Sequence, residues 1–220
     1  MQPLFISGIG TGIGKTFISA VLTEILRADY WKPVQAGLEG GTDSQTIRSL
    51  ISNSQSVIHP ETYRLKMPAS PHIAAREENI RLDTINIVSA CDRLKTNRPL
   101  IIEGAGGLLV PLNDSEFVID LVKKLDAKLI LVSRNYLGSI NHSLLTAAVC
   151  RQRGLSVAGW VFNDQFMDYE TEIVSWTGFP ALFSVPFLQP VSRDTVSREA
   201  GRHGDKIKKL FLEGPVHARE

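Results

Sequence analysis

The sequence predicts a doubly wound α/β domain, in which a mainly parallel sheet is flanked by helices. Short apolar runs rich in β-forming residues alternate with longer stretches of helical period. The runs are apolar throughout, which is typical of parallel strands that are covered on both faces. With 220 residues, of which 43% are hydrophobic, the chain is long enough to bury one such core and short for two. We therefore expect one domain that spans residues 1–220.

The predicted elements follow one another along the chain. Strands are expected at residues 4–7, 30–34, 100–102, 129–133, 157–162 and 181–185. Helices are expected near residues 15–28, 42–52, 82–97, 115–125, 140–153 and 166–176. Residues 53–81 have no clear period and contain three prolines, so we interpret them as a functional loop segment. The basic residues 206–209 are interpreted as the exposed face of a short C-terminal helix.

The overall composition argues against several classes of function. The net charge is +1, so no overall field favours a nucleic-acid or anionic-membrane partner. No apolar run approaches the ~18 residues that a membrane span requires, and the N-terminus runs into a strand without the pattern of a secretion signal. The two cysteines, Cys91 and Cys150, lack metal-ligand spacing and are expected to be buried free thiols. We expect a cytoplasmic protein.

A glycine-rich loop between the first strand and the first helix gives the strongest chemical signal. Residues 8–16 read G-I-G-T-G-I-G-K-T. Glycines let successive N–H groups point at phosphate oxygens, and the following helix adds the positive end of its dipole. Lys15 would neutralise charge on the β- and γ-phosphates, and the Thr16 hydroxyl would ligate Mg²⁺. Strand, glycines, Gly-Lys-Thr and helix in this order indicate a P-loop that binds Mg-ATP.

The spacing of this loop distinguishes it from related loops. The first glycine is Gly8, one residue earlier than in the standard motif, which gives G-x5-G-K-T. Position 10 is glycine, whereas partition-type ATPases carry a second, signature lysine there. The loop therefore argues against a partition ATPase.

Polar residues follow two further strands, where ligands collect in such sheets. Lys32 could contact an anionic substrate or the transferring phosphoryl group, although a surface lysine is the more common reason for such a residue. Asp43, farther along, is either a helix cap or a metal carboxylate. Glu103 directly follows an apolar strand, where P-loop enzymes place the acid that holds Mg²⁺. Because burying this carboxylate without a metal or a partner would be costly, we expect it to ligate the metal.

Two later segments have roles that the residues alone leave open. Ser139 or Asn141 could cap the helix expected near residue 140, and the free N–H groups of that helix could bind a carboxylate. His142 alone indicates a packed or exposed helix residue rather than a catalyst. The amide of Asn163 suits an adenine edge, and a turn-forming Asn-Asp pair explains it nearly as well.

Six motifs, taken together and in this order, resemble those of the dethiobiotin synthetase family. The family's loop is G-T-D-T-x-V-G-K-T, with the same one-residue-longer spacing as residues 8–16. The family's K-P-V-x-x-G, S-P-H, V-E-G-A-G-G, L-G-x-I-N-H and A-G-W-V-x-N-D correspond to residues 32–37, 70–72, 102–107, 137–142 and 158–164. The resemblance extends from about residue 4 to about residue 187, and the ordered set is far more specific than any single motif.

The resemblance implies an activity. It implies that 7,8-diaminopelargonic acid, CO₂ and ATP give dethiobiotin, ADP and phosphate, with Mg²⁺ as cofactor. A substrate amine would capture CO₂ as a carbamate, ATP would phosphorylate the carbamate, and the second amine would close the ring. The resemblance also implies a homodimer, in which residues 137–142 contact the distal carboxylate of the substrate across the interface.

The same resemblance implies the site residues. Lys15, Lys32 and Thr11 would be catalytic, and Thr16, Asp43 and Glu103 would hold magnesium. ATP would contact Gly12, Ile13, Gly14, Lys15, Thr16, Phe17, Asp43, Glu103, Gly104, Ala105, Gly106, Asn163, Asp164, Val185, Pro186 and Phe187. The substrate would contact Thr11, Lys32, Ala36, Gly138, Ser139, Ile140 and Asn141. Some family members have a hydroxyl residue where this chain has Ala36, and whether Gln35 replaces that hydroxyl is open.

Two other classes of P-loop protein share parts of this pattern. An amide-forming ligase of the cobyrinic acid amidating type usually carries a glutaminase domain with a reactive cysteine, for which the chain has no room. A partition or membrane-targeting switch ATPase would have the lysine that is missing at Gly10, or a more convincing basic amphipathic tail than residues 205–212. The sequence therefore favours the synthetase.

Overall fold

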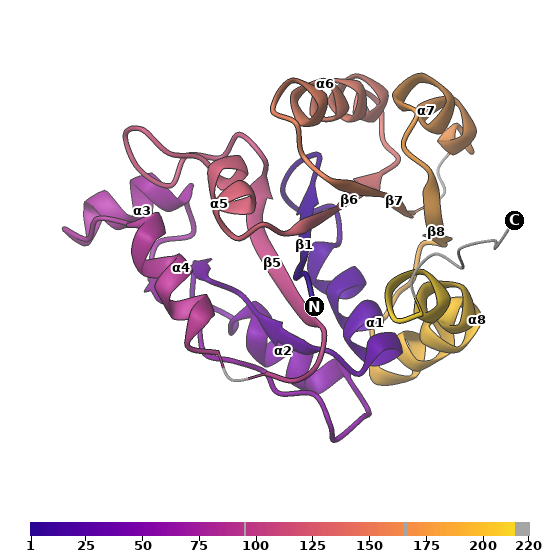
Figure 1. Ribbon diagram of the computed structural model, residues 1–220, viewed down its shortest axis with the longest axis horizontal. Helices are drawn as coiled ribbons and strands as arrows, with labels where there is room; N and C mark the ends of the chain where they lie inside the picture. Colours follow the sequence, from indigo (N-terminus) through magenta and orange to yellow (C-terminus); the bar gives the residue numbers. More distant parts are fainter. Residues whose placement is uncertain (95, 165–166, 214–220) are drawn as a thin grey trace, which may run out of the picture.

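A six-stranded parallel sheet lies at the centre of the structure (Figure 1). The computed structural model describes residues 1–94, 96–164 and 167–213. The strands of the main sheet are β1 (Leu4–Gly8), β2 (Asp29–Trp31), β5 (Leu100–Gly107), β6 (Lys128–Arg134), β7 (Val157–Asn163) and β8 (Ala181–Val185). They lie in the order β2-β5-β1-β6-β7-β8, and every neighbouring pair is parallel. A separate two-stranded sheet pairs β3 (Val34–Ala36) with β4 (Tyr63–Leu65).

Helices cover both faces of the main sheet. They are α1 (Lys15–Leu26), α2 (Asp43–Leu50), α3 (Pro71–Glu77), α4 (Thr84–Asp92), α5 (Val118–Lys124), α6 (Ser139–Gln152), α7 (Glu170–Thr177) and α8 (Arg193–Phe211). Helices α1, α2 and α8 pack together on one face, and α3 to α7 lie over the other (Figure 1). The fold class predicted from the sequence is confirmed.

Each face of the sheet buries its own apolar cluster. In β1, Phe5 belongs to the cluster beneath α3 to α7, and its neighbour Ile6 belongs to the cluster beneath α1, α2 and α8. Both side chains are fully buried. Successive residues of a strand point to opposite faces, so a strand that is covered on both faces must be apolar at every position. This explains the continuous apolar runs in the sequence.

The strand expected at residues 30–34 is in fact two strands in different sheets. Strand β2 ends at Trp31, and β3 belongs to the smaller sheet. Pro33 lies between them and has no N–H to donate to a ladder. Its carbonyl instead accepts a hydrogen bond from the backbone N–H of Thr62, at 3.0 Å. The chain therefore leaves the main sheet at Lys32, next to the carboxyl end of β2.

The loop expected at residues 53–81 is partly regular. It contains β4 and helix α3, which begins with Pro71 in the first helical turn. Proline suits that position because its φ is helical and its missing N–H would have no partner there. The three prolines of this segment led to the expectation of a loop, although one of them starts a helix.

The C-terminal helix is much longer than the short helix expected around residues 206–209. Helix α8 spans 19 residues, and its buried side chains Val196 and Ile207 join the cluster against α1. The helix expected at 166–176 begins only at Glu170, and residues 165 and 166 lie outside the described residues. Helix α4 spans Thr84–Asp92 rather than the expected 82–97, and α5 spans Val118–Lys124 rather than 115–125.

Both cysteines are free thiols, as expected, but only one is fully buried. Cys150 is buried in α6, whereas Cys91 is partly exposed in α4. Burial raises the pKa of the Cys150 thiol to about 12 and that of the Cys91 thiol to about 11. Neither thiol therefore has the character of a reactive cysteine.

The carboxyl edge of the main sheet brings three polar segments together. The glycine-rich loop follows β1, Glu103 lies in β5 opposite Ile6 of β1, and Asn163 ends β7. In parallel sheets this edge is where ligands bind. None of the described helices is both long and apolar enough to cross a membrane.

Candidate active site

The glycine-rich loop joins β1 to the first residue of α1, which is Lys15. Gly12 and Gly14 have φ values of 72° and 90°, which favour glycine. The Lys15 ammonium folds back over the loop and donates a hydrogen bond to the carbonyl oxygen of Gly10 at 2.8 Å. Burial lowers the pKa of Lys15 to about 8, against the attraction of Glu103. The lysine thus lies inside the loop, where phosphate oxygens would raise its pKa again.

Asn163 holds the glycine-rich loop from the end of β7. Its side-chain amide donates a hydrogen bond to the carbonyl oxygen of Ile13 at 2.7 Å. A Cβ at Gly14 would lie 2.0 Å from the Asn163 amide nitrogen, so glycine is required at that position for this approach as well as for its φ. Asn163 is the last residue of β7, and its side chain braces the glycine-rich loop.

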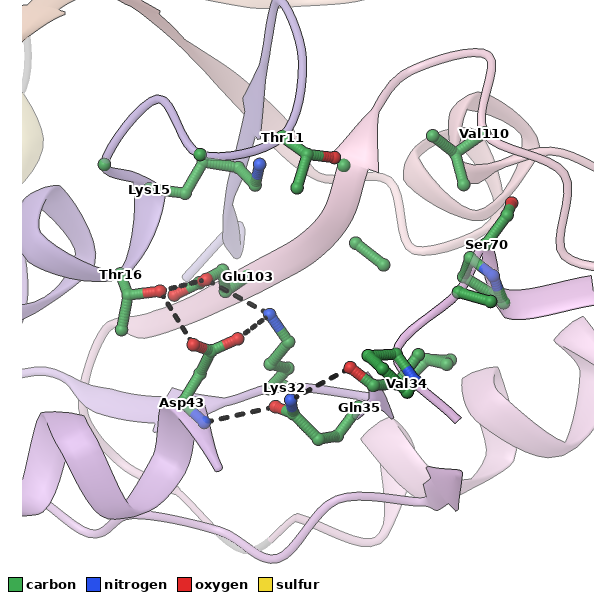
Figure 2. A pocket seen from close by; sticks show the side chains of 18 residues that line it. Thr11, Lys15, Thr16, Lys32, Val34, Gln35, Asp43, Ser70, Glu103 and Val110 are labelled. Carbon is green, nitrogen blue, oxygen red and sulfur yellow. Dashed lines mark hydrogen bonds and ion pairs between the residues drawn. The ribbon is translucent and has the colours of Figure 1, made fainter. Parts of the chain in front are cut away.

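Three oxygen-bearing side chains converge next to the loop. The hydroxyl of Thr16 lies 3.0 Å from Oδ1 of Asp43 and 2.9 Å from Oε1 of Glu103 (Figure 2). These residues come from α1, α2 and β5, which are separated in sequence but adjacent in the fold. Asp43 is the first residue of α2, and Thr42 rather than Asp43 caps that helix. Thr42 therefore performs the capping role that was left open for Asp43.

Lys32 lies between the same two carboxylates. Its ammonium forms an ion pair with Asp43 and another with Glu103 at 3.2 Å (Figure 2). Its side chain is only 7% exposed, so it is not the surface lysine that the sequence allowed. Burial lowers the pKa of Lys32, but the attraction of Glu103 and Asp43 outweighs this and raises the pKa above its usual value. The ammonium is therefore charged at neutral pH.

Tyr30 completes the surroundings of Glu103. Its hydroxyl donates a hydrogen bond to Oε2 of Glu103 at 2.9 Å, and both residues are buried. Oε1 of the same carboxylate already contacts Thr16 and Lys32, so both oxygens have partners. Burial and the negative charge of Glu103 raise the pKa of Tyr30 well above its usual value, which keeps the phenol as a donor. Sequence reasoning missed Tyr30 because its ring belongs to the apolar core of β2.

These groups line a cavity of about 770 Å³. The predicted site residues that line it are Thr11, Gly12, Gly14, Lys15, Thr16, Lys32, Ala36, Asp43, Glu103, Ala105 and Gly106. Its remaining walls are Val34, Gln35, Pro68, Ala69, Ser70, Pro71 and Val110. Most of these remaining residues belong to β3 or to the segment before α3, and none of them was among the predicted site residues. The signal that could have found them is the Ser-Pro-His motif itself.

The other predicted site residues lie outside this cavity. They are Ile13, Phe17, Gly104, Asn163, Asp164, Val185, Pro186, Phe187, Gly138, Ser139, Ile140 and Asn141. Gly104 packs on β1, where an added Cβ would lie 2.7 Å from the ring of Phe5.

A second cluster of predicted residues forms at the ends of β6, β7 and β8. The guanidinium of Arg134 donates to Oδ2 of Asp164 from Nε at 3.2 Å and from Nη2 at 3.1 Å. The backbone N–H of Asp164 bonds to the carbonyl of Val185 at 3.0 Å. Phe187 follows and is 56% exposed. This cluster adjoins the glycine-rich loop through Asn163, on the side away from Lys32.

The N-terminus of α6 is held by side chains but does not reach the cavity of its own chain. Gly138 has a φ of 101° before the helix begins at Ser139. The Ser139 hydroxyl lies 2.6 Å from the hydroxyl of Tyr169, which donates to the carbonyl of Tyr136 at 3.1 Å. Asn141 in the first turn is exposed. His142 contacts the Tyr136 hydroxyl at 2.8 Å and is an exposed residue of α6.

The oxygen atoms of Thr16, Asp43 and Glu103 fit a magnesium ion. Mg²⁺ takes oxygen ligands and usually binds through one or two carboxylates together with substrate phosphates and water. The described residues contain no group of three or more His, Cys, Asp and Glu side chains that could hold a metal alone. A cation here would therefore need phosphate oxygens from a nucleotide to complete its coordination.

Comparison with known proteins places the chain in a family. Residues 2–195 match a family model described as an AAA domain. The ATP-dependent dethiobiotin synthetase BioD of Cytophaga hutchinsonii is 48% identical over 202 residues, which cover 91% of this chain and 96% of that protein. The chain belongs to the dethiobiotin synthetase family. The synthetase of Agrobacterium fabrum is 43% identical over 212 residues, covering 96% of this chain and 97% of its relative.

Solved structures of other proteins share the fold of this dethiobiotin synthetase family member. A chain of the MinC:MinD cell division protein complex of Aquifex aeolicus has a TM-score of 0.58, covering 100% of this chain and 99% of its own. Its sequence identity is 13%, so this likeness concerns the fold alone. The cell division protein thus resembles the chain in architecture, whereas the synthetases resemble it in sequence along nearly the whole length.

Proposed function

We propose that this protein converts 7,8-diaminopelargonic acid, CO₂ and ATP to dethiobiotin, ADP and phosphate. Membership of the dethiobiotin synthetase family supports the reaction. The observation on which the proposal depends is that two ammonium groups and two carboxylates meet beside one phosphate-binding loop, in one cavity of about 770 Å³. Such a cavity can receive the triphosphate end of ATP and the reacting end of a diamino acid together.

Thr16, Asp43 and Glu103 would hold Mg²⁺ in this reaction. When bound, the cation would neutralise charge on the β- and γ-phosphates and help to align them. The N–H groups of the loop and the first turn of α1 would bind the same phosphates. Tyr30 would keep the Glu103 carboxylate oriented through its 2.9 Å hydrogen bond.

Lys15 and Lys32 would bring two anions together. One amine of the substrate captures CO₂ and becomes a carbamate, whose oxygen must approach the negatively charged γ-phosphate. The two ammonium groups line the cavity on which both anions would converge, and they would stabilise the charge that develops there. Thr11 also lines the cavity and would donate a hydrogen bond to the carbamate. The carbamate oxygen would attack the γ-phosphorus and ADP would leave, which gives a carbamic-phosphoric anhydride. Attack of the second amine on the anhydride carbon would then expel phosphate, release a proton and close the ring.

The base of the nucleotide would lie over the cluster at the ends of β7 and β8. Asn163 already uses one amide N–H on the loop, so its other N–H and its oxygen remain for the adenine edge. Pro186 and Phe187 would provide the apolar contact to the ring, and the buried Val185 would support them from the core. This arrangement puts the triphosphate across the loop, between the base and Lys32.

The functional unit would be a homodimer with shared active sites. The first turn of α6 has free N–H groups, and an anion is well placed at such a terminus. Residues Gly138 to Asn141 do not line the cavity of their own chain. Leu137 is 98% exposed and Leu145 is 57% exposed, which suits a surface that a second copy covers. The distal carboxylate of the substrate would bind to α6 of the partner subunit.

The reaction is tested by its products. Phosphate release should require Mg-ATP, the diamine and bicarbonate together, and mass spectrometry should detect dethiobiotin in amounts equal to the phosphate. Omission of any one component should reduce release to background. Steady ATP hydrolysis that is indifferent to the diamine would contradict the proposal and favour a switch ATPase.

A further inference from the structure

Gln35 lies at the centre of β3, with its side chain in the cavity wall close to Asp43 (Figure 2). The residue is only 7% exposed. Its amide oxygen accepts a hydrogen bond from the backbone N–H of Asp43 at 3.1 Å. Its amide nitrogen donates to the carbonyl of Gly37 at 3.0 Å and to that of Ala36 at 3.4 Å. The amide therefore joins the end of β3 to the start of α2.

These contacts show whether Gln35 replaces the hydroxyl group that some family members carry at the position of Ala36. A side chain that replaced this hydroxyl would need a polar atom directed at the substrate. Both ends of the Gln35 amide are instead bonded to the backbone of the protein itself. Gln35 is thus better suited to hold a neighbouring residue than to bind the substrate.

The neighbour that it holds is one of the residues assigned to the cation. The first N–H groups of a helix have no partner within the helix. At the start of α2, Thr42 and Gln45 satisfy two N–H groups through a reciprocal capping box. The N–H of Asp43 instead donates its hydrogen bond to the amide oxygen of Gln35, which belongs to strand β3. Gln35 therefore attaches the first turn of α2 to the strand that follows Lys32.

We propose that Gln35 is a positioning residue that holds the Asp43 carboxylate in the cation site and so sets the affinity for the divalent cation. This inference rests on the proposed function, which assigns Asp43 to magnesium. Without the Gln35 amide, α2 keeps its own cap, but its first turn is no longer fixed to β3. The Asp43 carboxylate could then move away from Thr16, which it contacts at 3.0 Å. Residues that orient metal ligands typically change metal affinity by about 10- to 100-fold when they are replaced.

The test compares two replacements of similar size, each of which removes the acceptor for one N–H at the start of α2. Gln35→Met removes the acceptor for the Asp43 N–H. The matched control, Gln45→Met, removes the acceptor for the Thr42 N–H, a 2.8 Å bond that does not involve Asp43. Binding of Mn²⁺ to each protein in the presence of ADP is measured by electron paramagnetic resonance, and the Mg²⁺ dependence of turnover is measured in parallel.

Gln35→Met should weaken Mn²⁺ binding at least roughly tenfold, and its turnover should recover to within a few fold of wild type at saturating Mg²⁺. Gln45→Met should bind Mn²⁺ within about twofold of wild type, although it loses one of the two hydrogen bonds of the capping box. If Gln35→Met does not fold, Gln35→Asn keeps a polar amide that is too short to reach Asp43, and it should show the same loss. Wild-type Mn²⁺ affinity in a folded Gln35 variant, or equal weakening in Gln45→Met, would overturn the inference.

The two proposals can fail separately. If the wild-type protein makes no dethiobiotin but Gln35→Met still weakens Mn²⁺ binding, the reaction is wrong and the role of Gln35 stands. If dethiobiotin forms and the Gln35 variants bind Mn²⁺ as wild type does, the reaction stands and the role of Gln35 is wrong.

Discussion

The ammonium nitrogen of Lys32 lies 3.2 Å from Oε1 of Glu103, and the Thr16 hydroxyl contacts the same oxygen at 2.9 Å. Lys32 also forms an ion pair with Asp43. An ammonium group and a magnesium ion would therefore use the same carboxylate oxygens. The effect of Lys32 on turnover of the substrate and its effect on the affinity for the cation can therefore be measured separately.

The first prediction concerns turnover. Lys32→Ala should leave ATP binding nearly intact and should lower turnover at least about a hundredfold, as the loss of one electrostatic stabiliser does. Lys15→Ala should weaken both nucleotide binding and turnover, because Lys15 lies inside the phosphate loop. Calorimetric titration with ATP and steady-state kinetics give the two quantities. Turnover of Lys32→Ala close to the wild-type rate would exclude this lysine from the chemistry.

The second prediction concerns the cation in the nucleotide-free protein. Lys32→Met should raise the affinity for Mn²⁺ by at least roughly tenfold, because a unit charge is removed next to two carboxylates. The control is Lys124→Met, which removes the ion pair to Glu116 on another part of the molecule and should leave Mn²⁺ affinity unchanged. Unchanged or weaker Mn²⁺ binding in Lys32→Met would mean that the lysine holds the carboxylates in place rather than competing with the cation.

The third prediction uses the pH dependence of stability. Burial disfavours the charged form of Glu116, but hydrogen bonds from Lys124, Thr84 and Asn113 outweigh it and lower the pKa of Glu116 to about 2. Between this value and its ordinary value of 4.5, the unfolded chain binds more protons than the folded one, so stability rises with pH. The contribution is fully present above pH 4.5 and is lost as the pH falls toward 2.

Replacement of this glutamate tests the contribution. Glu116→Gln should lower the free energy of unfolding at pH 7 by about 1 kcal/mol, a small value because the ion pair is partly solvated. Urea denaturation at a series of pH values should show the difference from wild type shrinking below pH 4.5. Replacement of the exposed Glu77 by Gln serves as control and should show no such trend. A difference that stays constant with pH would contradict the prediction.

The fourth prediction concerns the proposed homodimer and its shared active site. Asn141→Asp should fold well, since an acidic residue in the first turn of a helix is stabilising, but its charge should repel the distal carboxylate and raise the KM for the diamine. Co-expression with Lys15→Ala would give mixed dimers in which one site carries both changes and the other carries neither. About a quarter of all sites would then regain activity under random pairing. No recovery in purified mixed dimers would show that each chain forms its site alone.

The sequence predicted the site best where signals from a few neighbouring residues determine the local structure. The glycine-rich loop and Glu103 follow from strand, turn and helix signals over a few neighbouring positions, and the structure places them next to each other. Lys32 and Asp43 were ambiguous as single residues, and only the ordered set of family motifs favoured their role. Lys32 reaches Glu103 from the point where the chain leaves β2 and continues through Pro33 to the smaller sheet. That change of sheet is not visible in the apolar pattern.

Other contacts could not be predicted because they join distant parts of the chain through ordinary residues. Tyr30 looks like any buried aromatic residue of a strand, yet its hydroxyl orients Glu103 across 73 positions of sequence. Gln35 gives no signal until β3 and α2 are packed together. The length of α8 was missed because its exposed polar face is much larger than its buried one, so a simple apolar count underestimates it.

The hydrogen bond from Asn163 to Ile13 has a consequence for nucleotide choice. Asn163, which is expected to recognise the base, also holds the glycine-rich loop, which is expected to bind the phosphates. A base that fits poorly and pulls Asn163 aside would loosen that loop at the same moment. The wrong nucleotide would then be penalised in the rate of phosphoryl transfer as well as in its affinity, so fidelity and catalysis would depend on a single amide.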